Sequence, residues 1–271
     1  MTYTDTMTAT LRFLAPSDTP PVYRASEGGV DAELVLEGEY EDHDVKIENG
    51  RLGASNLTLD REGFAFQLHA SEVADFYDDA AIAETYTAEV EALVRQATGA
   101  NRTLCFDHTR RADSRQLRGE HTSREPSSIV HNDYTDKSGP QRVLDLMKDE
   151  AGELLARRFA IVNVWRPIRH PAETSILALC DAASARTQDL IPAPRIARNR
   201  IGELMLAHYH TDQRWVAFPA MDPGEALLLK TFDSATDGRS RFAIHTAFDN
   251  PTPSASAKPR ESIESRVFAF F

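Results

Sequence analysis

The stretch SSIVHNDYT, residues 127–135, places His131 and Asp133 two positions apart, directly after a short apolar run. On a β-strand, residues i and i+2 point to the same face, so this imidazole and this carboxylate could bind one ion. A facial iron site uses two imidazoles and one carboxylate and leaves three coordination positions open. By itself the pair is more typical of a polar strand end, so a metal site requires a third ligand from elsewhere in the chain.

His245, in the strand-like segment RFAIHTAF, is the candidate for that third ligand. A buried, hydrogen-bonded core histidine would fit the same segment. His208 and His210 compete for the role, because the sequence HYH also puts two imidazoles on one face of a strand. A cupin-type site would add a glutamate a few residues later, but the next glutamate, Glu225, is too far downstream. We therefore expect His208 and His210 to support the ligands, to face the substrate or to be exposed.

Arg260 and Ser262 follow in the C-terminal segment KPRESIESRVFAFF. An iron oxygenase that uses 2-oxoglutarate must hold a dicarboxylate, with one end on the iron and the other on a charged group. Arginine offers a bidentate fork for a carboxylate, and a neighbouring hydroxyl can assist it. Arg266 is the alternative anchor. An R-x-S pattern alone is common. The combination on a β-rich chain of H-x-D, then a distant histidine, then R-x-S is more specific than any one of these motifs.

Short strands are the main secondary structure that the sequence predicts. Alternating segments between residues 31 and 70, with a turn at Asn49-Gly50, favour hairpins. After residue 158, further short apolar segments are separated by Pro, Gly, Asp and Asn. Many short strands without intervening helices favour an antiparallel barrel or sandwich over a parallel α/β sheet.

Two helices are expected beside these strands. Residues 79–100 repeat apolar side chains at steps of three and four, and Gly99 suits the C-terminal cap. A second helix is expected from about residue 140 to 157, with Ser138 and Gln141 at capping-box spacing. The sequence therefore predicts a mainly β protein with flanking helices.

One domain, residues 1–271, is the expected organisation. Within it we expect residues 1–10 to be mobile, residues 31–100 to form N-terminal strands and a helix, and residues 101–271 to form the core.

The acidic excess, 42 Asp and Glu against 30 Lys and Arg, argues against nucleic-acid or anionic-membrane binding, which need a basic surface. The two cysteines form no CxxC pattern, and the N-terminus does not have the features of a secretory signal. Apolar runs are too short for a membrane span. We expect a cytoplasmic protein that acts on a small molecule, with a homodimer as the base-rate oligomeric state.

Five arginines, in the segment HTRRADSRQLRGEHTSREP that leads towards His131, stand out in this acidic chain. The segment could be a mobile lid over the pocket or could grip an anionic substrate. A solvated loop that balances the acidic surface is the competing interpretation.

Several stretches together resemble a known family. FDHTRR, VHNDYT, NVWRPI, LALCDA, RWVAFPAMDPGEALLLKTFDS, HTAF and PRESIESR occur in order over roughly residues 100–271. They resemble the non-heme Fe(II), 2-oxoglutarate-dependent oxygenases that include the cephamycin 7-hydroxylation protein, fungal meroterpenoid endoperoxide-forming enzymes and gibberellin-desaturase-like proteins.

The resemblance implies a double-stranded β-helix, or jelly-roll, core with His131, Asp133 and His245 as iron ligands. It implies that Arg260 takes the distal carboxylate of 2-oxoglutarate, with Ser262 beside it. Asn163, Trp165 and Arg166 would lie on a core strand near the site. Arg166 is a candidate for direct cofactor binding, or else pairs with an acidic residue such as Asp181 or Asp233.

The implied activity is that of a dioxygenase of natural-product biosynthesis that uses Fe(II), 2-oxoglutarate and O2. Such enzymes abstract hydrogen from a small molecule and give hydroxylation, desaturation or ring closure. The residues alone leave three alternatives: a metal-dependent hydrolase with the same ligands, a catalytically silent binding jelly roll, and an iron enzyme that does not use 2-oxoglutarate.

Overall fold

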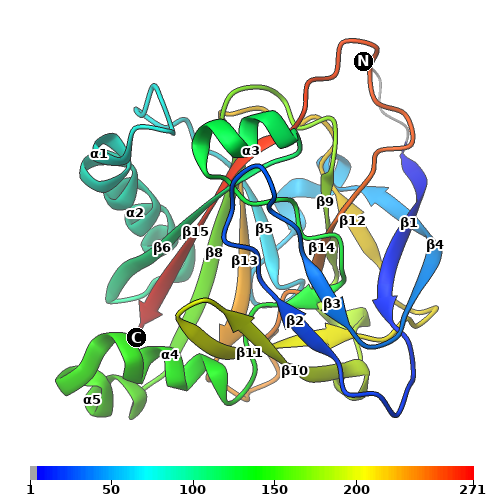
Figure 1. The fold of residues 1–271 in the computed structure, drawn as a ribbon. Coiled ribbons are helices and arrows are strands. Elements are labelled where there is room, and N and C mark those ends of the chain that lie inside the picture. The colour runs from blue at the N-terminus through cyan, green and yellow to red at the C-terminus, as the bar shows by residue number, and fades with distance from the viewer. Residues whose placement is uncertain (1–4) are drawn as a thin grey trace.

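Alternation of buried and exposed side chains marks the strands that form the walls of the molecule. In β4 (Tyr40–Asn49), for example, Val45 and Ile47 are buried while their neighbours face outward. The computed structural model describes residues 5–271. Two curled sheets face each other and make a mainly β jelly roll, with helices on the outside (Figure 1).

The larger sheet has ten strands and carries both segments of the H-x-D…H pattern. Its order is β1 (Thr6–Leu14), β4, β12 (Trp215–Ala217), β9 (Ile176–Cys180), β14 (His245–Phe248), β7 (His131–Asn132), β11 (Arg200–Ala207), β10 (Leu190–Ala197), β2 (Val22–Arg24) and β3 (Val35–Glu37).

The smaller sheet has five strands and carries the R-x-S segment. Its order is β5 (Phe64–Leu68), β13 (Glu225–Asp233), β8 (Phe159–Pro167), β15 (Glu261–Phe270) and β6 (Arg102–Ala112). All its pairings are antiparallel. Strand β8 is buried along its whole length because the larger sheet covers one face and helices cover the other.

The helix expected at residues 79–100 covers the outer face of the smaller sheet. It consists of α1 (Asp79–Ala81), a π-helical turn (Ile82–Tyr86) and α2 (Thr87–Thr98), and it ends at Gly99 with φ +71° as expected. Its apolar side chains pack against outward-facing residues of β8 and β15 such as Val162 and Val267. This packing leaves the other face of β8 and β15 free to line the interior.

Helix α4 (Ser138–Met147), a 3₁₀ turn (Lys148–Glu150) and α5 (Ala151–Leu155) form the second expected helix, which is interrupted. The predicted capping box is absent. Ser138 accepts a hydrogen bond from the backbone of Thr135 instead, and the residue before the helix makes no side-chain cap. A short helix, α3 (Arg115–His121), and 3₁₀ turns at Gly50–Asn56, Ala182–Ser184 and Thr187–Asp189 complete the elements.

The N-terminal expectation was wrong for residues 6–10. They are the first half of β1, which pairs with β4 from Thr6 onward, so backbone hydrogen bonds order them. Residues 1–4, also expected to be mobile, lie outside the described residues.

The hairpin expected at Asn49-Gly50 does not form. The side chain of Asn49 accepts a hydrogen bond from the backbone of Arg51 and starts a 3₁₀ helix, and β4 pairs with β1 and β12 instead.

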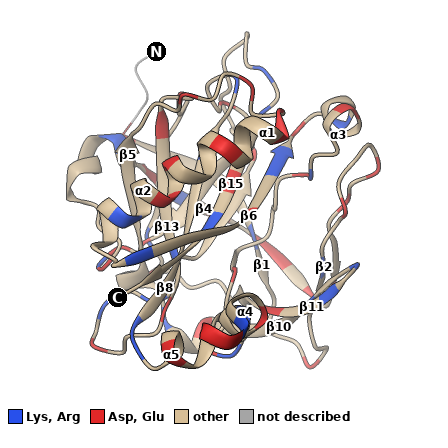
Figure 2. Cartoon of the chain, turned by 90° about the vertical axis from the view of Figure 1, so that its left-hand side faces the viewer, with Lys and Arg blue, Asp and Glu red and all other residues tan. Residues whose placement is uncertain are grey.

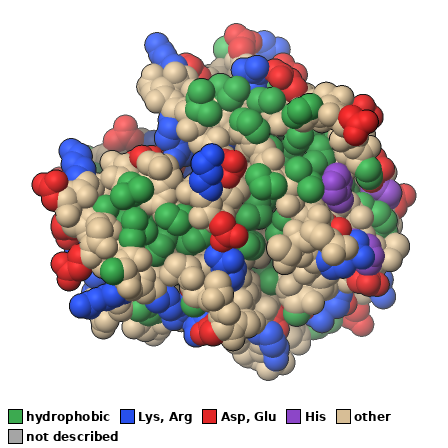
Figure 3. Space-filling view, turned by 90° about the horizontal axis from the view of Figure 1, so that it is seen from below, with side chains coloured by type: hydrophobic (Ala, Val, Ile, Leu, Met, Phe, Trp, Pro, Cys, Tyr) green, Lys and Arg blue, Asp and Glu red, His purple; other side chains and the backbone are tan. Residues whose placement is uncertain are grey.

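Charged groups of both signs are interspersed over helices and strands (Figure 2), and the face seen in Figure 3 mixes hydrophobic, basic and acidic side chains. None of the helices within residues 5–271 is long and apolar enough to cross a membrane.

Candidate metal centre

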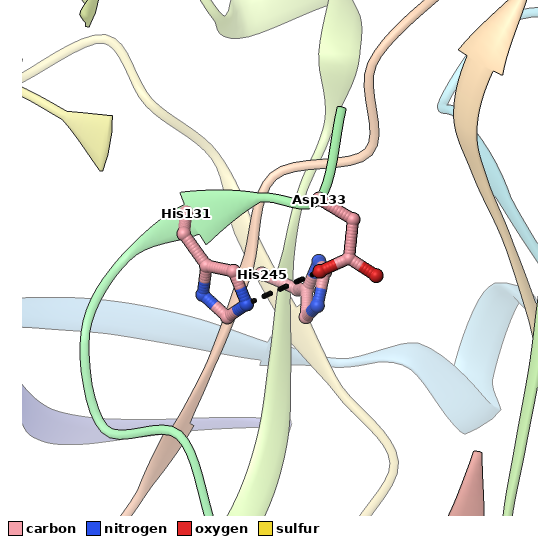
Figure 4. Close-up of side chains that lie close together, drawn as sticks. All are labelled: His131, Asp133 and His245. Carbon is pink, nitrogen blue, oxygen red and sulfur yellow. Dashed lines mark ion pairs between the residues drawn. The ribbon is translucent and has the colours of Figure 1, made fainter. Parts of the chain in front are cut away.

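His131, Asp133 and His245 meet inside the jelly roll. Strands β7 and β14 are neighbours, and His131 pairs directly with His245 across them. Asp133 follows β7 and turns back towards both rings (Figure 4). Nε2 of His131 lies 3.6 Å from Oδ1 of Asp133, and one ligand atom from each residue falls within 4.8 Å of the others. The structure therefore brings together the three residues that the sequence pattern singled out.

Backbone carbonyls orient both imidazoles. Nδ1 of His131 lies 2.7 Å from the carbonyl oxygen of Ile129, and Nδ1 of His245 lies 2.8 Å from that of Ala243. Because a carbonyl only accepts hydrogen bonds, each Nδ1 carries the proton and donates it. Each Nε2 then keeps its lone pair for a metal, which is the usual arrangement of metal-binding histidines.

Burial keeps His131 neutral. Burial, with a smaller contribution from the neighbouring His245, lowers the pKa of His131 to about 3. A neutral imidazole is the form that binds a metal ion.

Asp133 is held as a carboxylate by its neighbours. Burial alone would raise its pKa, but Arg266 and the two imidazoles outweigh burial and hold the pKa of Asp133 well below its usual range. Its Oδ2 accepts hydrogen bonds from Nε of Arg266 at 3.0 Å and from the Asn163 amide at 2.8 Å. Oδ1 is thereby left facing His131.

A second row of charges, on β15 and the neighbouring strand β6, supports Asp133. Arg266 also donates to Glu264 at 2.8 Å and to Asp107 at 2.6 Å, and the Asn163 amide donates to Glu264 at 2.9 Å. Sequence reasoning did not single out Glu264 or Asp107. The signal was present for Glu264, since Arg260, Ser262, Glu264 and Arg266 alternate along one strand face.

Arg260, the residue just before β15, and Ser262 on that strand face the same inward side. Arg260 is 3% exposed, its guanidinium lies 5.7 Å from the Trp165 ring, and one of its Nη groups donates to the carbonyl of Ser175. Burial lowers the pKa of Arg260 to about 10, so it remains charged at neutral pH.

Two donors at this place have no partner. Among residues 5–271, Nε of Arg260 and the hydroxyl of Ser262 are buried without a hydrogen bond. Unpaired buried polar groups are costly, and a carboxylate would satisfy both. These residues therefore fit the distal carboxylate of 2-oxoglutarate, and the cluster of two imidazoles and one carboxylate fits Fe(II).

Arg266, the alternative anchor, is already occupied. Its three guanidinium nitrogens contact Asp133, Asp107 and Glu264. Four of its five N–H donors are used by Asp133, Asp107, Thr109 and Glu264, so it offers no free bidentate fork for a further dicarboxylate.

The structure does not bring Arg166 to the centre. Arg166 lies on the opposite face of β8, where its side chain bonds the carbonyl and the ring of His69 at 3.1 and 2.6 Å and lies 5.3 Å from the Tyr86 ring. Its partner is thus a histidine, not Asp181 or Asp233. Asn163 and Trp165, by contrast, face inward.

His208 and His210 also lie apart from the cluster. Nδ1 of His208 donates to the carbonyl of Leu14 at 2.8 Å, and His210 lies 3.4 Å from Asp212.

The arginine-rich segment is not a continuous loop, because it contains the end of β6 and helix α3. Arg110 bonds the carbonyl of Phe76 on the outside of β6, and Arg118 bonds the backbone at the end of that strand. Arg115 forms an exposed pair with Asp31. Asp133 borders a cavity, and Arg124 is the only one of these five arginines that lines it.

Comparisons with known proteins agree with this geometry. A family model described as "Oxidoreductase/YMDC permease-like domain" matches residues 11–270. The hydroxylase/desaturase CTB9 of Cercospora beticola is 32% identical in an alignment 263 residues long, and the match covers 88% of this chain and 79% of that protein. The Fe(II)/2-oxoglutarate-dependent dioxygenase nvfI of Aspergillus novofumigatus is 30% identical over 239 residues, 84% of this chain and 83% of that protein.

Similarity extends to a solved structure. The iron and alpha-ketoglutarate-dependent endoperoxidase NvfI superposes with a TM-score of 0.85 at 26% identity, covering 98% of each chain. The resemblance seen in the sequence and the jelly-roll expectation are confirmed. The chain therefore belongs to the non-heme Fe(II)- and 2-oxoglutarate-dependent dioxygenases and is an enzyme that uses Fe(II), 2-oxoglutarate and O2.

Proposed function

We propose that this enzyme oxidises a C–H bond of a small, secondary-metabolite-like molecule by hydrogen abstraction, with hydroxylation, desaturation or ring closure as the outcome. His131, Asp133 and His245 hold the iron, and Arg260 with Ser262 holds the distal carboxylate of 2-oxoglutarate. The observation that carries the proposal is the pairing of a His-Asp-His cluster with two unpartnered buried donors on β15. Relatives named hydroxylase/desaturase and endoperoxidase support the reaction class.

Bound Fe(II), 2-oxoglutarate and O2 supply an oxidant that is strong enough to remove hydrogen from a C–H bond, with release of succinate and CO2. This chain's own residues provide position and environment. Asn163 and Arg266 fix Oδ2 of Asp133 and so direct Oδ1 to the ligand cluster. Buried apolar side chains such as Trp165 and Leu179 keep water away from the interior wall.

Replacement of the anchor arginine tests the 2-oxoglutarate assignment. Arg260→Gln is expected to weaken 2-oxoglutarate binding to the anaerobic Fe(II) protein about tenfold to a hundredfold, because hydrogen bonds to charged groups contribute about 1.5–3 kcal/mol. Calorimetric titration measures this change.

Arg166→Gln is the matched control, since it removes a buried arginine from the other face of the same sheet. It is expected to leave 2-oxoglutarate affinity within about threefold of wild type, a change of less than about 0.7 kcal/mol, which is below the contribution of a hydrogen bond to a charged group. If Arg166→Gln weakens binding and Arg260→Gln does not, the anchor is assigned to the wrong residue. Succinate formation that requires O2 separates this function from a hydrolase or a silent binding protein.

A further inference from the structure

A cavity of about 340 Å³ opens beside Asp133 and Arg266. Its walls come from β6, the start of α4 and the β10–β11 turn, elements that Figure 2 shows around one side of the jelly roll. The volume is within the range of small-molecule sites. Because it reaches a proposed metal ligand, it is the natural place for the substrate.

Arginine dominates the charge of this cavity. Six arginines and four carboxylates line it, which gives a formal excess of two positive charges in a chain whose net charge is −12. The arginines are Arg124, Arg142, Arg195, Arg198, Arg200 and Arg266, and the carboxylates are Glu27, Asp107, Asp133 and Glu203.

The carboxylates already have partners. Asp107 and Asp133 accept hydrogen bonds from Arg266. Glu203 accepts one from the Thr135 hydroxyl, and Glu27 pairs with Arg198 at 3.3 Å. Among residues 5–271, none of these four carboxylates lies within 4.0 Å of the guanidinium groups of the remaining arginines.

Four of the arginines are unpaired. Within residues 5–271, no carboxylate oxygen lies within 4.0 Å of the guanidinium groups of Arg124, Arg142, Arg195 and Arg200, and none of these side chains donates a hydrogen bond to a protein acceptor. Arg142 lies over the Phe106 ring at 5.3 Å, and its Nε is buried without a partner.

This crowding is unfavourable in the free protein. Burial and neighbouring arginines lower the pKa of Arg124 and of Arg195, and burial, then Arg142, lowers that of Arg200. Asp107, Asp133 and Asp145 offset this effect only in part, so an incoming anion would relieve the remaining repulsion between the arginines.

Arg195 connects the cavity with the metal ligands. Its guanidinium lies 5.9 Å from the Tyr23 ring, and that ring lies 6.2 Å from the ring of His131. A molecule held by Arg195 can therefore extend towards the proposed iron site. The 2-oxoglutarate anchor is a different residue, Arg260, which does not line this cavity.

We propose that the substrate carries an anionic oxygen group, a carboxylate or a phosphate, which Arg124, Arg195 and Arg200 bind while the rest of the molecule points to the metal. The proposal rests on the proposed function, because it assigns the substrate class of that same site.

Matched aromatic probes test the proposal without knowledge of the substrate. The protein is loaded anaerobically with Fe(II) and saturating 2-oxoglutarate, so that Arg260 is occupied, and is titrated calorimetrically with 2-naphthoate, 2-naphthyl phosphate or neutral 2-naphthamide. We expect at least one anionic probe to bind at least tenfold more tightly than the amide, and the better of the two identifies the group. Equal binding of all three probes would overturn the proposal.

Variants test whether the cavity arginines cause the preference for an anionic probe. Arg195→Gln combined with Arg200→Gln should remove the preference for the anion, while Arg115→Gln, an exposed arginine outside the cavity, should keep it. The single variants Arg195→Gln and Arg200→Gln should each unfold at a urea concentration no lower than wild type, because each substitution removes one repulsive charge from the cavity. The assignment of these arginines would be contradicted if the double variant still preferred the anion. If the double variant does not fold, a preference retained in both single variants would contradict it.

The visible charge-transfer band of the Fe(II)–2-oxoglutarate protein, recorded in the same samples, keeps the two claims apart. If the band is present and the probes bind equally, the anion proposal alone is overturned. If the band is absent and the anion preference persists, the anion site is supported and the oxygenase assignment is overturned.

Discussion

Arg266 fixes the metal centre although it is not one of the proposed ligands. Its guanidinium contacts Asp133, Asp107 and Glu264, and these carboxylates raise the pKa of Arg266 well above its usual value although burial opposes them. The charge on Arg266 in turn keeps Asp133 ionised and directs it.

Arg266→Gln should therefore damage both the fold and the metal site. Loss of one partner of a buried charge network costs about 3–5 kcal/mol of unfolding free energy. The pKa of Asp133 should rise, so Co(II) binding should be lost at a higher pH than in wild type. Urea unfolding and Co(II) titrations between pH 5 and 8 measure both effects.

Arg102→Gln serves as the control, since it breaks an exposed pair with Glu150 and should cost less than about 1 kcal/mol. An Arg266→Gln protein with wild-type stability and an unchanged pH profile for Co(II) would refute the positioning role.

Single residues also show where an alternating pattern predicts the direction of a side chain on a strand and where it does not. Arg260, Ser262, Glu264 and Arg266 repeat every second position, so the polar face of β15 could be predicted from the sequence. Strand β8 is buried on both faces, and only the three-dimensional structure shows that Arg166 points to His69 and away from the interior.

Among the elements, most strands followed their apolar segments, but β10 was not foreseen. Pro192 and Pro194 argue against a strand because proline cannot donate to a neighbouring strand. The structure accommodates them because β10 pairs with β2 only through Arg195 and Ile196, beyond both prolines. Two cavity arginines, Arg195 and Arg200, thus come from strands whose pairing the sequence did not reveal.

Gly50 shows a second case in which the sequence did not predict an element correctly. The sequence suggested a turn, which glycine favours through positive φ, yet Gly50 does not have a positive φ. A Cβ at this position would lie 2.6 Å from the Phe218 ring and 2.7 Å from Val216. Glycine is required here because β12 and the ring after it pack closely against the start of the 3₁₀ helix.

Gly50→Ala should accordingly lower the unfolding free energy by about 1–3 kcal/mol, as overpacking of a core does. The matched control is Gly53→Ala in the same 3₁₀ segment, where an added Cβ meets nothing within 4 Å. Urea denaturation of both variants provides the comparison. Equal stability of the two would show that the packing argument is mistaken.

For the whole molecule, buried and half-buried histidines link stability to pH. Burial is the main cause that lowers the pKa of His69, His108 and His131, the last to about 3. As pH falls through about 6.5, the histidines of the unfolded chain therefore take up protons before these groups do in the folded state. Stability of the metal-free enzyme is therefore lost on acidification through this range.

His131 alone should contribute about 2 kcal/mol to the loss of stability between pH 7 and pH 5. This window lies above the pKa values of unfolded Asp and Glu side chains, about 3.9 and 4.3. Urea unfolding of the metal-free enzyme at both pH values measures the loss, and His131→Gln should reduce it by about that amount. The same pH dependence in wild type and variant would mean that His131 is not buried as a neutral group.

The central claim is that His131, Asp133 and His245 bind an iron that chelates 2-oxoglutarate. Its most direct test is an anaerobic titration of the metal-free enzyme with Fe(II) and 2-oxoglutarate, followed by visible absorption. The account predicts a weak charge-transfer band in wild type that needs both additions and that is lost in His131→Ala and in His245→Ala. No band in wild type, or a band that persists in either alanine variant, would contradict it.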